Sequence, residues 1–274
     1  MDNILIIGGD SRLMHLKTAM ENDGFNVKMF DDGTPLKSAL DASDVVILGL
    51  PASRDDKTVD ARGLKEPVLI KDLFRMIGSR KLLLAGKMTA SMKAVADVFS
   101  VRWVDYFAHE DFEMLNAVPT CEGALQIAME ELPITLHGSN AIVTGYGKIG
   151  AILARDLYLL GAKTKVVARR AQSRARANAD NLDAFDFSKL PELVKTADVI
   201  FNTVPQCVIG RDVLVNAKNA LIIDLASKPG GVDVEAARDL GVPVIWALGL
   251  PGKVAPVTAG EIIKKTVYSI LNEI

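Results

Sequence analysis

The sequence holds only two cysteines, Cys121 and Cys207, and no run of like charges. Two cysteines cannot build the disulfide framework of a small secreted protein, so we expect a reducing cytoplasm as the compartment. A formal net charge of −2 over 274 residues supplies no general basic field. This argues against nucleic acid or an anionic membrane as a partner.

Long hydrophobic stretches are also absent from the sequence. No apolar run approaches the ~18 residues that a membrane-spanning helix needs. Residues 1–9 enter a strand without a preceding basic segment, so we expect no signal peptide. With 49% hydrophobic and 24% charged residues, the composition is ordinary for a globular protein, and the length allows two modest domains.

A glycine-rich run at residues 145–150 is the main motif of the chain. A short apolar strand precedes it at residues 140–144, and apolar residues at helical spacing follow it up to Leu160. This strand, turn and helix start are typical of a dinucleotide site, in which backbone amides approach the pyrophosphate. A purely structural turn is the alternative. We predict that the cofactor contacts Gly145, Tyr146, Gly147, Lys148 and Ile149, while Gly150 allows the helix to pack closely on the strand.

The next expected strand, residues 163–168, indicates which dinucleotide binds. A site for NAD usually carries Asp or Glu about 20 residues beyond the glycines, to accept from the ribose 2′-OH. Here Arg169 and Arg170 stand at that place, and guanidinium groups can bind a 2′-phosphate. A solvated basic helix start is the alternative. The position favours NADP, with Ala168, Arg169 and Arg170 as contacts.

Strands and helices alternate along both halves of the chain. Strands separated by helices imply right-handed crossovers and parallel sheets, so we predict an α/β fold of two Rossmann-like domains with a cleft between them. The first domain covers residues 1–118 and the cofactor-binding domain residues 119–257. We expect an apolar stripe on a closing helix, residues 258–274, to pack back on the first domain.

Two local features refine this organisation. Residues 108–132 are helical in pattern but broken near Pro119, which predicts a new helix with Thr120 near its N-cap. The turn Gly8-Gly9-Asp10 lacks a third glycine at the required spacing. We therefore interpret it as a tight strand-to-helix turn and not as a second phosphate loop.

Loops rich in glycine and proline follow several expected strands of the second domain. They should meet at the carboxyl edge of the sheet, where the nicotinamide end of a cofactor would lie. Turn chemistry alone is the alternative for each loop. The polar loop 51–65 of the first domain also follows a strand, and either a mobile cover or a plain surface loop fits it. We predict cofactor contacts from Thr203, Val204, Pro205, Ala226, Ser227 and Gly249.

Four segments carry a resemblance to a known family. Residues 116–123, 135–139, 223–231 and 249–260 resemble the family of the dipicolinate synthase A subunit, most specifically from residue 116 onward. The resemblance implies an amino-terminal Rossmann-like domain and an NADP-binding Rossmann domain. This layout is similar to that of 2-hydroxyacid dehydrogenases and adenosylhomocysteinase.

The resemblance also implies an activity. Together with a flavoprotein-like B subunit, the family converts the product of dihydrodipicolinate synthase into dipicolinate during sporulation and reduces NADP. We therefore expect a cytoplasmic enzyme with the B subunit of dipicolinate synthase as its partner, a small dicarboxylate substrate and a homo-oligomeric state. Two alternatives stay open: another NADP-dependent dehydrogenase of a small carboxylate, and a non-catalytic NADP-binding subunit.

A ring with two carboxylates calls for cations or hydrogen-bond donors in the site. Lys228 is the preferred anion partner, with Lys253 and Lys87 as alternatives, and Ser53 and Thr120 could donate to a carboxylate. Glu122 is the candidate base, and capping of a helix that begins near Thr120 is its alternative role. We assign no metal ligands.

The histidines and Cys207 offer less. His109 lies in a charged run and reads as a surface residue, and His137 should fix the entry of the strand before the glycine run. The dehydrogenases with this layout place a catalytic histidine late in the chain, and none follows His137 here. Cys207 could face the nicotinamide, although a small buried hydrophobe is the commoner role of a cysteine.

Overall fold

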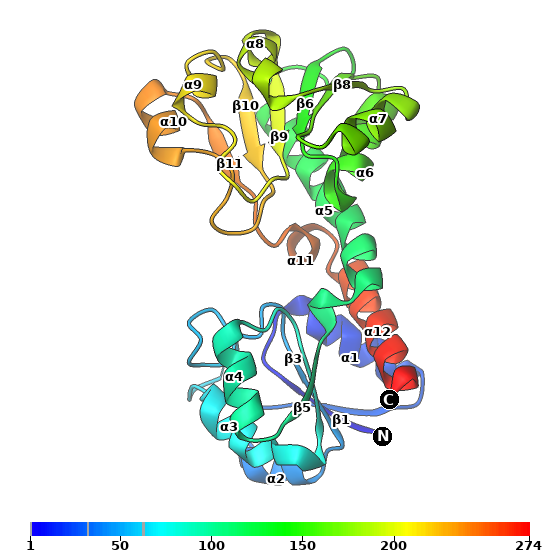
Figure 1. Ribbon diagram of the computed structural model, residues 1–274. Coiled ribbons are helices and arrows are strands. Elements are labelled where there is room, and N and C mark those ends of the chain that lie inside the picture. Colours follow the sequence, from blue (N-terminus) through cyan, green and yellow to red (C-terminus); the bar gives the residue numbers. More distant parts are fainter. Residues whose placement is uncertain (1, 32, 62–63) are drawn as a thin grey trace. The chain divides into compact units, whose positions relative to one another are not determined.

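The computed structural model describes residues 2–31, 33–61 and 64–274 (Figure 1). The chain divides into two compact units. Unit 1 comprises Met1–Asn116 and Ala255–Ile274, and unit 2 comprises Ala117–Val254. Each unit is built around one parallel β-sheet, so the predicted α/β class with two parallel sheets is confirmed.

The sheet of unit 1 has five parallel strands in the order β2-β1-β3-β4-β5. Its central strands β1, β3 and β4 are buried almost throughout and, apart from Asn3 at the start of β1, consist of aliphatic residues. This is expected where helices cover both faces of a parallel sheet. The strands are β1 (Asn3–Ile7), β2 (Asn26–Met29), β3 (Val45–Leu48), β4 (Leu82–Ala85) and β5 (Arg102–Asp105).

Helices cover the two faces of this sheet and form two hydrophobic clusters. One cluster includes Leu73 and Phe74 of α3, and the other joins Leu13 of α1 to Ile263 and Val267 of α12. Helix α12 lies along α1, so the end of the chain completes the core of unit 1 (Figure 1). The helices are α1 (Ser11–Asn22), α2 (Leu36–Asp41), α3 (Ile70–Ile77), α4 (Ala90–Val98) and α12 (Pro256–Glu273), with the 3-10 helices η1 (Gly78–Arg80) and η2 (Tyr106–Ala108).

The sheet of unit 2 has six parallel strands in the order β11-β10-β9-β6-β7-β8. From β6, the strands β7 and β8 follow on one side and β9, β10 and β11 on the other. This is the strand order of dinucleotide-binding Rossmann folds. The order reverses between β6 and β9, and ligands of such sheets bind at that point. The strands are β6 (Asn140–Thr144), β7 (Lys163–Val167), β8 (Asp183–Phe185), β9 (Val199–Asn202), β10 (Leu221–Asp224) and β11 (Val244–Trp246).

The remaining helices connect the strands of unit 2. Helix α6 packs on the sheet through Leu153, Ala154 and Leu157, which are fully buried. None of the helices in the described residues is long and apolar enough to cross a membrane. The helices are α6 (Lys148–Leu159), α7 (Ala171–Ala179), α8 (Leu190–Leu193), α9 (Arg211–Leu214), α10 (Val234–Leu240) and α11 (Leu250–Val254), with the 3-10 helices η3 (Phe187–Lys189) and η4 (Val194–Thr196).

Helix α5 (Glu110–Glu131) is continuous over 22 residues with Pro119 inside it. The predicted break near Pro119, with a new helix that starts at Thr120, is therefore wrong. Proline removes one backbone hydrogen bond from a helix. Packing offsets that loss here, because Cys121 and Ala124 are completely buried and Gly123 lies against Leu250 of α11.

Candidate functional site

The turn between β6 and α6 has the geometry that the glycine run predicted. Gly145 has φ +90°, a conformation that favours glycine, and an added Cβ there would overlap Thr203 Oγ1. A Cβ on Gly150 would overlap the carbonyl oxygen of Gly145. Both positions therefore require glycine: one for the turn, the other for close packing of helix on strand.

Gly147 differs from these two glycines because it faces open space. It is the N-cap of α6, and no side chain in the described part of the chain caps that helix. A Cβ on Gly147 would meet no described heavy atom within 4 Å. The first turn of a helix carries N–H groups without intrahelical acceptors, and the helix dipole favours negative charge there. The start of α6 thus has the free N–H groups, the open space and the dipole that favour an anion such as a pyrophosphate.

The side chain of Tyr146 is turned into the unit and anchors the turn. Its ring belongs to the hydrophobic core of unit 2, and its hydroxyl donates to Asp180 Oδ2 at 2.6 Å. Burial and the bond to Asp180 raise the pKa of Tyr146, so the phenol keeps its proton. The side chain of Tyr146 is therefore engaged within the unit, and its predicted cofactor contact falls to its backbone.

The end of β7 lies beside this turn, because the Gly145 N–H donates to Val167 O at 2.8 Å. Ala168 is buried there, whereas Arg169 and Arg170 are exposed. Arg174 has a different role, since its Nη1 donates to Ala168 O at 2.9 Å and to Arg169 O at 2.7 Å. It also pairs with Asp186 at 3.1 Å. Arg174 thus braces the backbone from which the two exposed guanidinium groups project.

The predicted nicotinamide-end loops follow β9, β10 and β11. Thr203 comes directly after β9, the neighbour of β6, and its Oγ1 donates to Thr144 O at 2.7 Å. The side chain of Val204 also lies against Gly145, and Pro205 is exposed after it. Ala226 and Ser227 follow β10, one strand farther from β6, and the exposed Gly249 follows β11. Among the residues predicted from these three loops, Thr203 and Val204 thus lie directly against Gly145.

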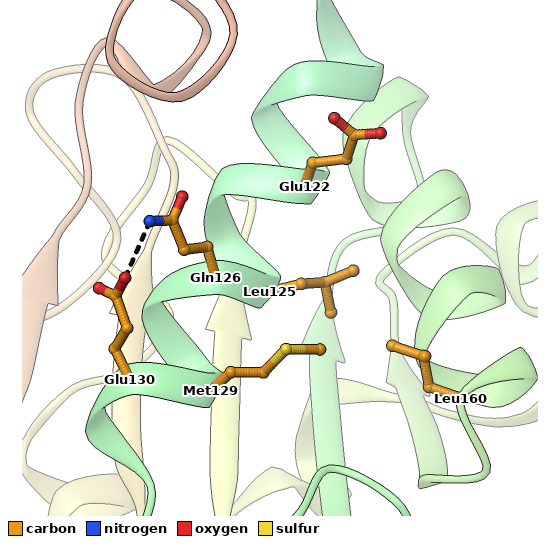
Figure 2. A pocket seen from close by; sticks show the side chains of 6 residues that line it. All are labelled: Glu122, Leu125, Gln126, Met129, Glu130 and Leu160. Atoms are coloured by element: carbon orange, nitrogen blue, oxygen red, sulfur yellow. Dashed lines mark hydrogen bonds between the residues drawn. The ribbon is translucent and has the colours of Figure 1, made fainter.

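Glu122, the candidate base, lies in the middle of α5 and is exposed. Its alternative role as a helix cap is wrong, because the helix begins twelve residues earlier, at Glu110. Figure 2 shows Glu122 on the wall of a surface pocket of about 520 Å³ that lies along α5 and reaches the end of α6. The other lining residues are Leu125, Gln126, Met129, Glu130 and Leu160.

Three other candidates have clear positions. Lys228 is exposed in the loop after β10, at a cis peptide bond with Pro229. Thr120 is only 8% exposed and lies inside α5, so its predicted place near an N-cap is wrong. Cys207 is exposed, and the alternative role of a buried hydrophobe is also wrong.

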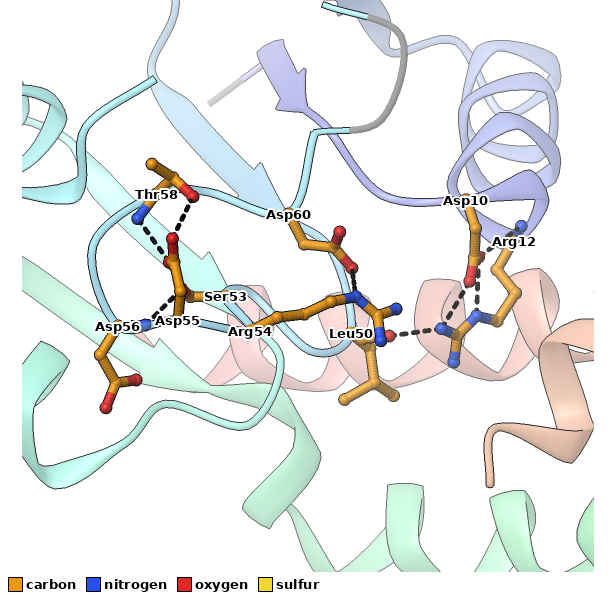
Figure 3. A network of polar contacts seen from close by, with 9 residues as sticks. All are labelled: Asp10, Arg12, Leu50, Ser53, Arg54, Asp55, Asp56, Thr58 and Asp60. Carbon is orange, nitrogen blue, oxygen red and sulfur yellow. Dashed lines mark hydrogen bonds and ion pairs between the residues drawn. The ribbon is translucent and has the colours of Figure 1, made fainter. Parts of the chain in front are cut away.

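The hydroxyl of Ser53 is engaged within the polar loop of unit 1 (Figure 3). It donates to Asp55 Oδ1 at 3.2 Å and accepts from the Asp56 N–H at 3.0 Å. Hydrogen bonds from the backbone of Thr58 and of Lys57 hold the pKa of Asp55 well below its usual range. Asp55 thus organises this loop, of which residues 62 and 63 lie outside the described residues.

Two buried polar residues of unit 2 were not found by sequence reasoning. Asn202 is completely buried and Asp224 is 2% exposed, and they end the neighbouring strands β9 and β10. One sequence feature could have identified them. Each is a polar residue that ends an apolar strand and directly precedes a loop predicted to contact the cofactor. Among the described residues, no group of three or more His, Cys, Asp or Glu side chains could hold a metal ion.

Comparisons with known proteins agree with this division of the chain. Residues 3–107 match the family of the N-terminal domain of the dipicolinate synthase A subunit, and residues 126–244 match Shikimate / quinate 5-dehydrogenase. The dipicolinate synthase A subunit of Bacillus subtilis (strain 168) is 32% identical, over 99% of this chain and 96% of that protein.

Solved structures show the same fold. The crystal structure of the dipicolinate synthase A subunit from Bacillus halodurans matches with a TM-score of 0.91 and 27% identity, over 98% of this chain and 97% of that one. D-lactate dehydrogenase from Escherichia coli matches with a TM-score of 0.65 and 14% identity, over 98% and 96% of the two chains. The fold is thus that of the 2-hydroxyacid dehydrogenases. The chain belongs to the family of the dipicolinate synthase A subunit, and its second unit is an NAD(P)-binding Rossmann-like domain.

Proposed function

We propose that this chain oxidises dihydrodipicolinate to dipicolinate with NADP as the hydride acceptor. The observation that carries the proposal is the similarity, along 99% of this chain, to a protein named as the A subunit of dipicolinate synthase. The glycine turn of unit 2 supports it, since the geometry there suits a dinucleotide.

The choice of NADP rests on the end of β7. Arg169 and Arg170 are exposed where a site for NAD usually carries a carboxylate, and Arg174 holds the backbone beneath them. A guanidinium binds a phosphate through charge-assisted, often bidentate hydrogen bonds. A 2′-phosphate on the adenosine ribose would therefore be recognised by these two side chains.

The reaction removes a hydride and a proton from a partly reduced ring that bears two carboxylates. When bound, the nicotinamide of NADP would accept the hydride. The substrate ring would then become the aromatic pyridine of dipicolinate. The chain has to hold the two carboxylates and to exclude water. Lys228 is our proposed anion partner, because its exposed ammonium follows β10 at the edge that carries the nicotinamide-end loops. Glu122 and Thr120 stay predictions, while Ser53 serves its own loop.

The name of the relative designates one subunit of dipicolinate synthase and so implies another. We propose that the B subunit is the partner of this chain in a cytoplasmic complex formed during sporulation. The resemblance to the family implies that this B subunit is flavoprotein-like. We also propose that the chain forms a homo-oligomer.

A spectrophotometric assay tests the activity. The chain is mixed with NADP and freshly generated product of dihydrodipicolinate synthase, with and without the B subunit, and the NADPH absorbance band is followed. We expect NADPH and dipicolinate to form in equal amounts. Turnover of 2-hydroxy or amino acids, with none of this substrate, would instead assign a different dehydrogenase. Binding of NADPH without turnover, even with the B subunit, would assign a non-catalytic role.

The double variant Arg169→Asp, Arg170→Ala tests the cofactor. Loss of two charge-assisted hydrogen bonds should raise the Kd for NADPH about 100-fold and leave the Kd for NADH within about threefold. Arg211→Ala is the matched control, because this exposed arginine of the same unit pairs with Asp239 on α10. An equal rise for both cofactors would contradict the assignment of the 2′-phosphate.

A further inference from the structure

A row of polar side chains crosses the carboxyl ends of three neighbouring strands in unit 2. Thr144 of β6 is in register with Asn202 of β9, and Asn202 is in register with Asp224 of β10. Each is the last residue of its strand, and all three are at most 2% exposed. Buried polar groups of this kind are stable only when they are hydrogen-bonded.

The three side chains are joined in a fixed direction. Thr144 Oγ1 donates to Asn202 Oδ1 at 2.6 Å, and Asn202 Nδ2 donates to Asp224 Oδ1 at 2.7 Å. A carboxylate only accepts, so it sets the orientation of the Asn202 amide, which in turn sets the Thr144 hydroxyl. Exchange of any member for a group of opposite hydrogen-bonding character would leave a buried donor or acceptor unpaired.

The row also holds the backbone of the two loops that follow β9 and β10. The Asn202 amide accepts from the Val204 N–H at 3.1 Å and donates to Val204 O at 3.0 Å. Asp224 accepts from the Ala226 N–H at 3.0 Å and from the Gly231 N–H at 2.8 Å. All four hydrogen-bonding positions of the Asn202 amide are thus used, and the Asp224 carboxylate has three donors.

Two further contacts join the loops to each other and to the edge of the sheet. A Cβ on Gly231 would overlap Asn202 Nδ2 and Val204 O, so glycine there lets one loop lie directly on the other. Trp246, at the end of β11, donates from Nε1 to Ala226 O at 2.9 Å. The loops after β9 and β10 therefore cannot shift independently of the polar row.

We propose that Asp224 and Asn202 are positioning residues for the nicotinamide end of the cofactor, an inference that rests on the proposed binding of NADP at the glycine turn. They act by holding Thr203–Val204 in place against Gly145, and Ala226–Ser227 in place in the loop after the next strand, β10. Arg169 and Arg170, the proposed contacts of the adenosine end, follow β7, which lies on the other side of β6 from β9 and β10. A defect in the row should therefore affect one end of the dinucleotide and spare the other.

Two ligands that differ only in the nicotinamide test this proposal. Calorimetry on the full chain measures the Kd for NADPH and for 2′-phospho-ADP-ribose, with wild type and Asp224→Asn. The Asp224 carboxylate only accepts hydrogen bonds. In the variant, the NH₂ group of the new amide is a donor and would face the N–H groups that donate to Asp224. We expect the Kd for NADPH to rise about tenfold or more and the Kd for 2′-phospho-ADP-ribose to stay within about twofold. An equal rise for both ligands would overturn the proposal, because general destabilisation would act on both.

Asp198→Asn is the matched control. Asp198 precedes β9 at the opposite edge of the same sheet, where it accepts from the Asn140 N–H at 2.7 Å and from Asn140 Nδ2 at 3.2 Å. This variant should lower the stability of unit 2 and change neither Kd. A selective loss of NADPH in Asp198→Asn would show that the effect is not particular to the row, and would count against it.

A milder variant keeps the test decisive if Asp224→Asn does not fold. Trp246→Phe removes the bond to Ala226 O and the part of the indole ring beside Gly230 but leaves the polar row itself unchanged. We expect a smaller rise, about threefold, for NADPH alone. Unchanged NADPH binding in this variant would overturn the proposal. If the wild-type chain bound neither ligand, the proposed function would fall and this inference with it. If the wild type bound both and failed to oxidise dihydrodipicolinate, only the substrate assignment would fall.

Discussion

In each unit the turn between the first strand and the following helix has the same place in the sheet topology, but the residues around the two turns differ. In unit 1 the turn joins β1 to α1, next to β3, and in unit 2 it joins β6 to α6, next to β9. Each lies at the point where the strand order reverses, where parallel sheets bind their ligands. Among the described residues, neighbouring atoms fill this place in unit 1 and leave it open in unit 2.

The turn of unit 1 is closed by the unit itself. The Gly9 N–H donates to Asp60 O at 2.8 Å, and a Cβ on Gly8 would lie 2.5 Å from that oxygen. Asp10 caps α1 by accepting from the Arg12 N–H at 3.2 Å, and its carboxylate pairs with the Arg12 guanidinium at 2.8 Å. Arg12, 6% exposed, also donates to Leu50 O, as Figure 3 shows.

These contacts exclude a phosphate from α1. The backbone of the polar loop takes the space, and the Asp10 carboxylate already satisfies the helix start with a negative charge. At α6 the N-cap is Gly147, which has no side chain, and a Cβ added there would meet no described heavy atom within 4 Å. Strand, turn and helix alone therefore do not make a nucleotide site. The residue at the N-cap and the neighbouring loop decide it.

The largest expected effect follows from filling the open turn. In Gly147→Val the new Cβ meets no described heavy atom within 4 Å, and the extended backbone of Gly147 (φ −88°) accepts any residue. We expect the Tm to change by at most about 2 °C and the Kd for NADPH to rise more than about 100-fold. Gly147→Ala should lie between wild type and this variant. Unchanged binding in both would contradict a pyrophosphate at this turn.

The corresponding change in the closed turn should affect stability and not the cofactor. Gly8→Ala places a Cβ against Asp60 O at a residue with φ +72°. We expect a loss of about 3 kcal/mol in the free energy of unfolding, measured by urea titration, with the Kd for NADPH unchanged.

Gly24→Ala is the control for backbone strain in that experiment. Gly24 has φ +94°, and an added Cβ would meet no described heavy atom within 4 Å. This variant should lose only about 1 kcal/mol. If Gly8→Ala and Gly24→Ala lost equal stability, the polar loop would not be what closes the turn of unit 1.

The smallest expected effect is a change in Tm from a substitution in the polar loop, which closes the turn of unit 1. Because the folded state lowers the pKa of Asp55, its stabilisation is present above the unfolded pKa of about 3.9 and is lost as the pH falls through the folded value. Asp55→Asn should therefore have a slightly lower Tm than wild type from about pH 5 to pH 8, and the difference should shrink below about pH 4. A Tm difference that did not depend on pH would contradict this role of the carboxylate.

Much of unit 2 could be predicted from the sequence because its signals are local. The strand, the glycine turn and the start of α6 depend on residues within about ten positions of one another, and the structure has them where the pattern placed them. The short elements β8 and α2 were missed, since each has too few residues for a periodic pattern. The break near Pro119 was predicted wrongly, because buried contacts along α5 outweighed the local effect of one proline.

Neighbouring residues in the chain account for the alternation of strands and helices, the need for glycine at residues 145 and 150, and the two arginines after β7. Local sterics and charge decide these features, so they can be read without the fold. Two features depend instead on the folded chain: Asp60 closes the turn at Gly8, and Asn202 and Asp224 form one row with Thr144. Residues from 22 to 58 positions apart meet there. Their contacts depend on strand register, which no local pattern specifies.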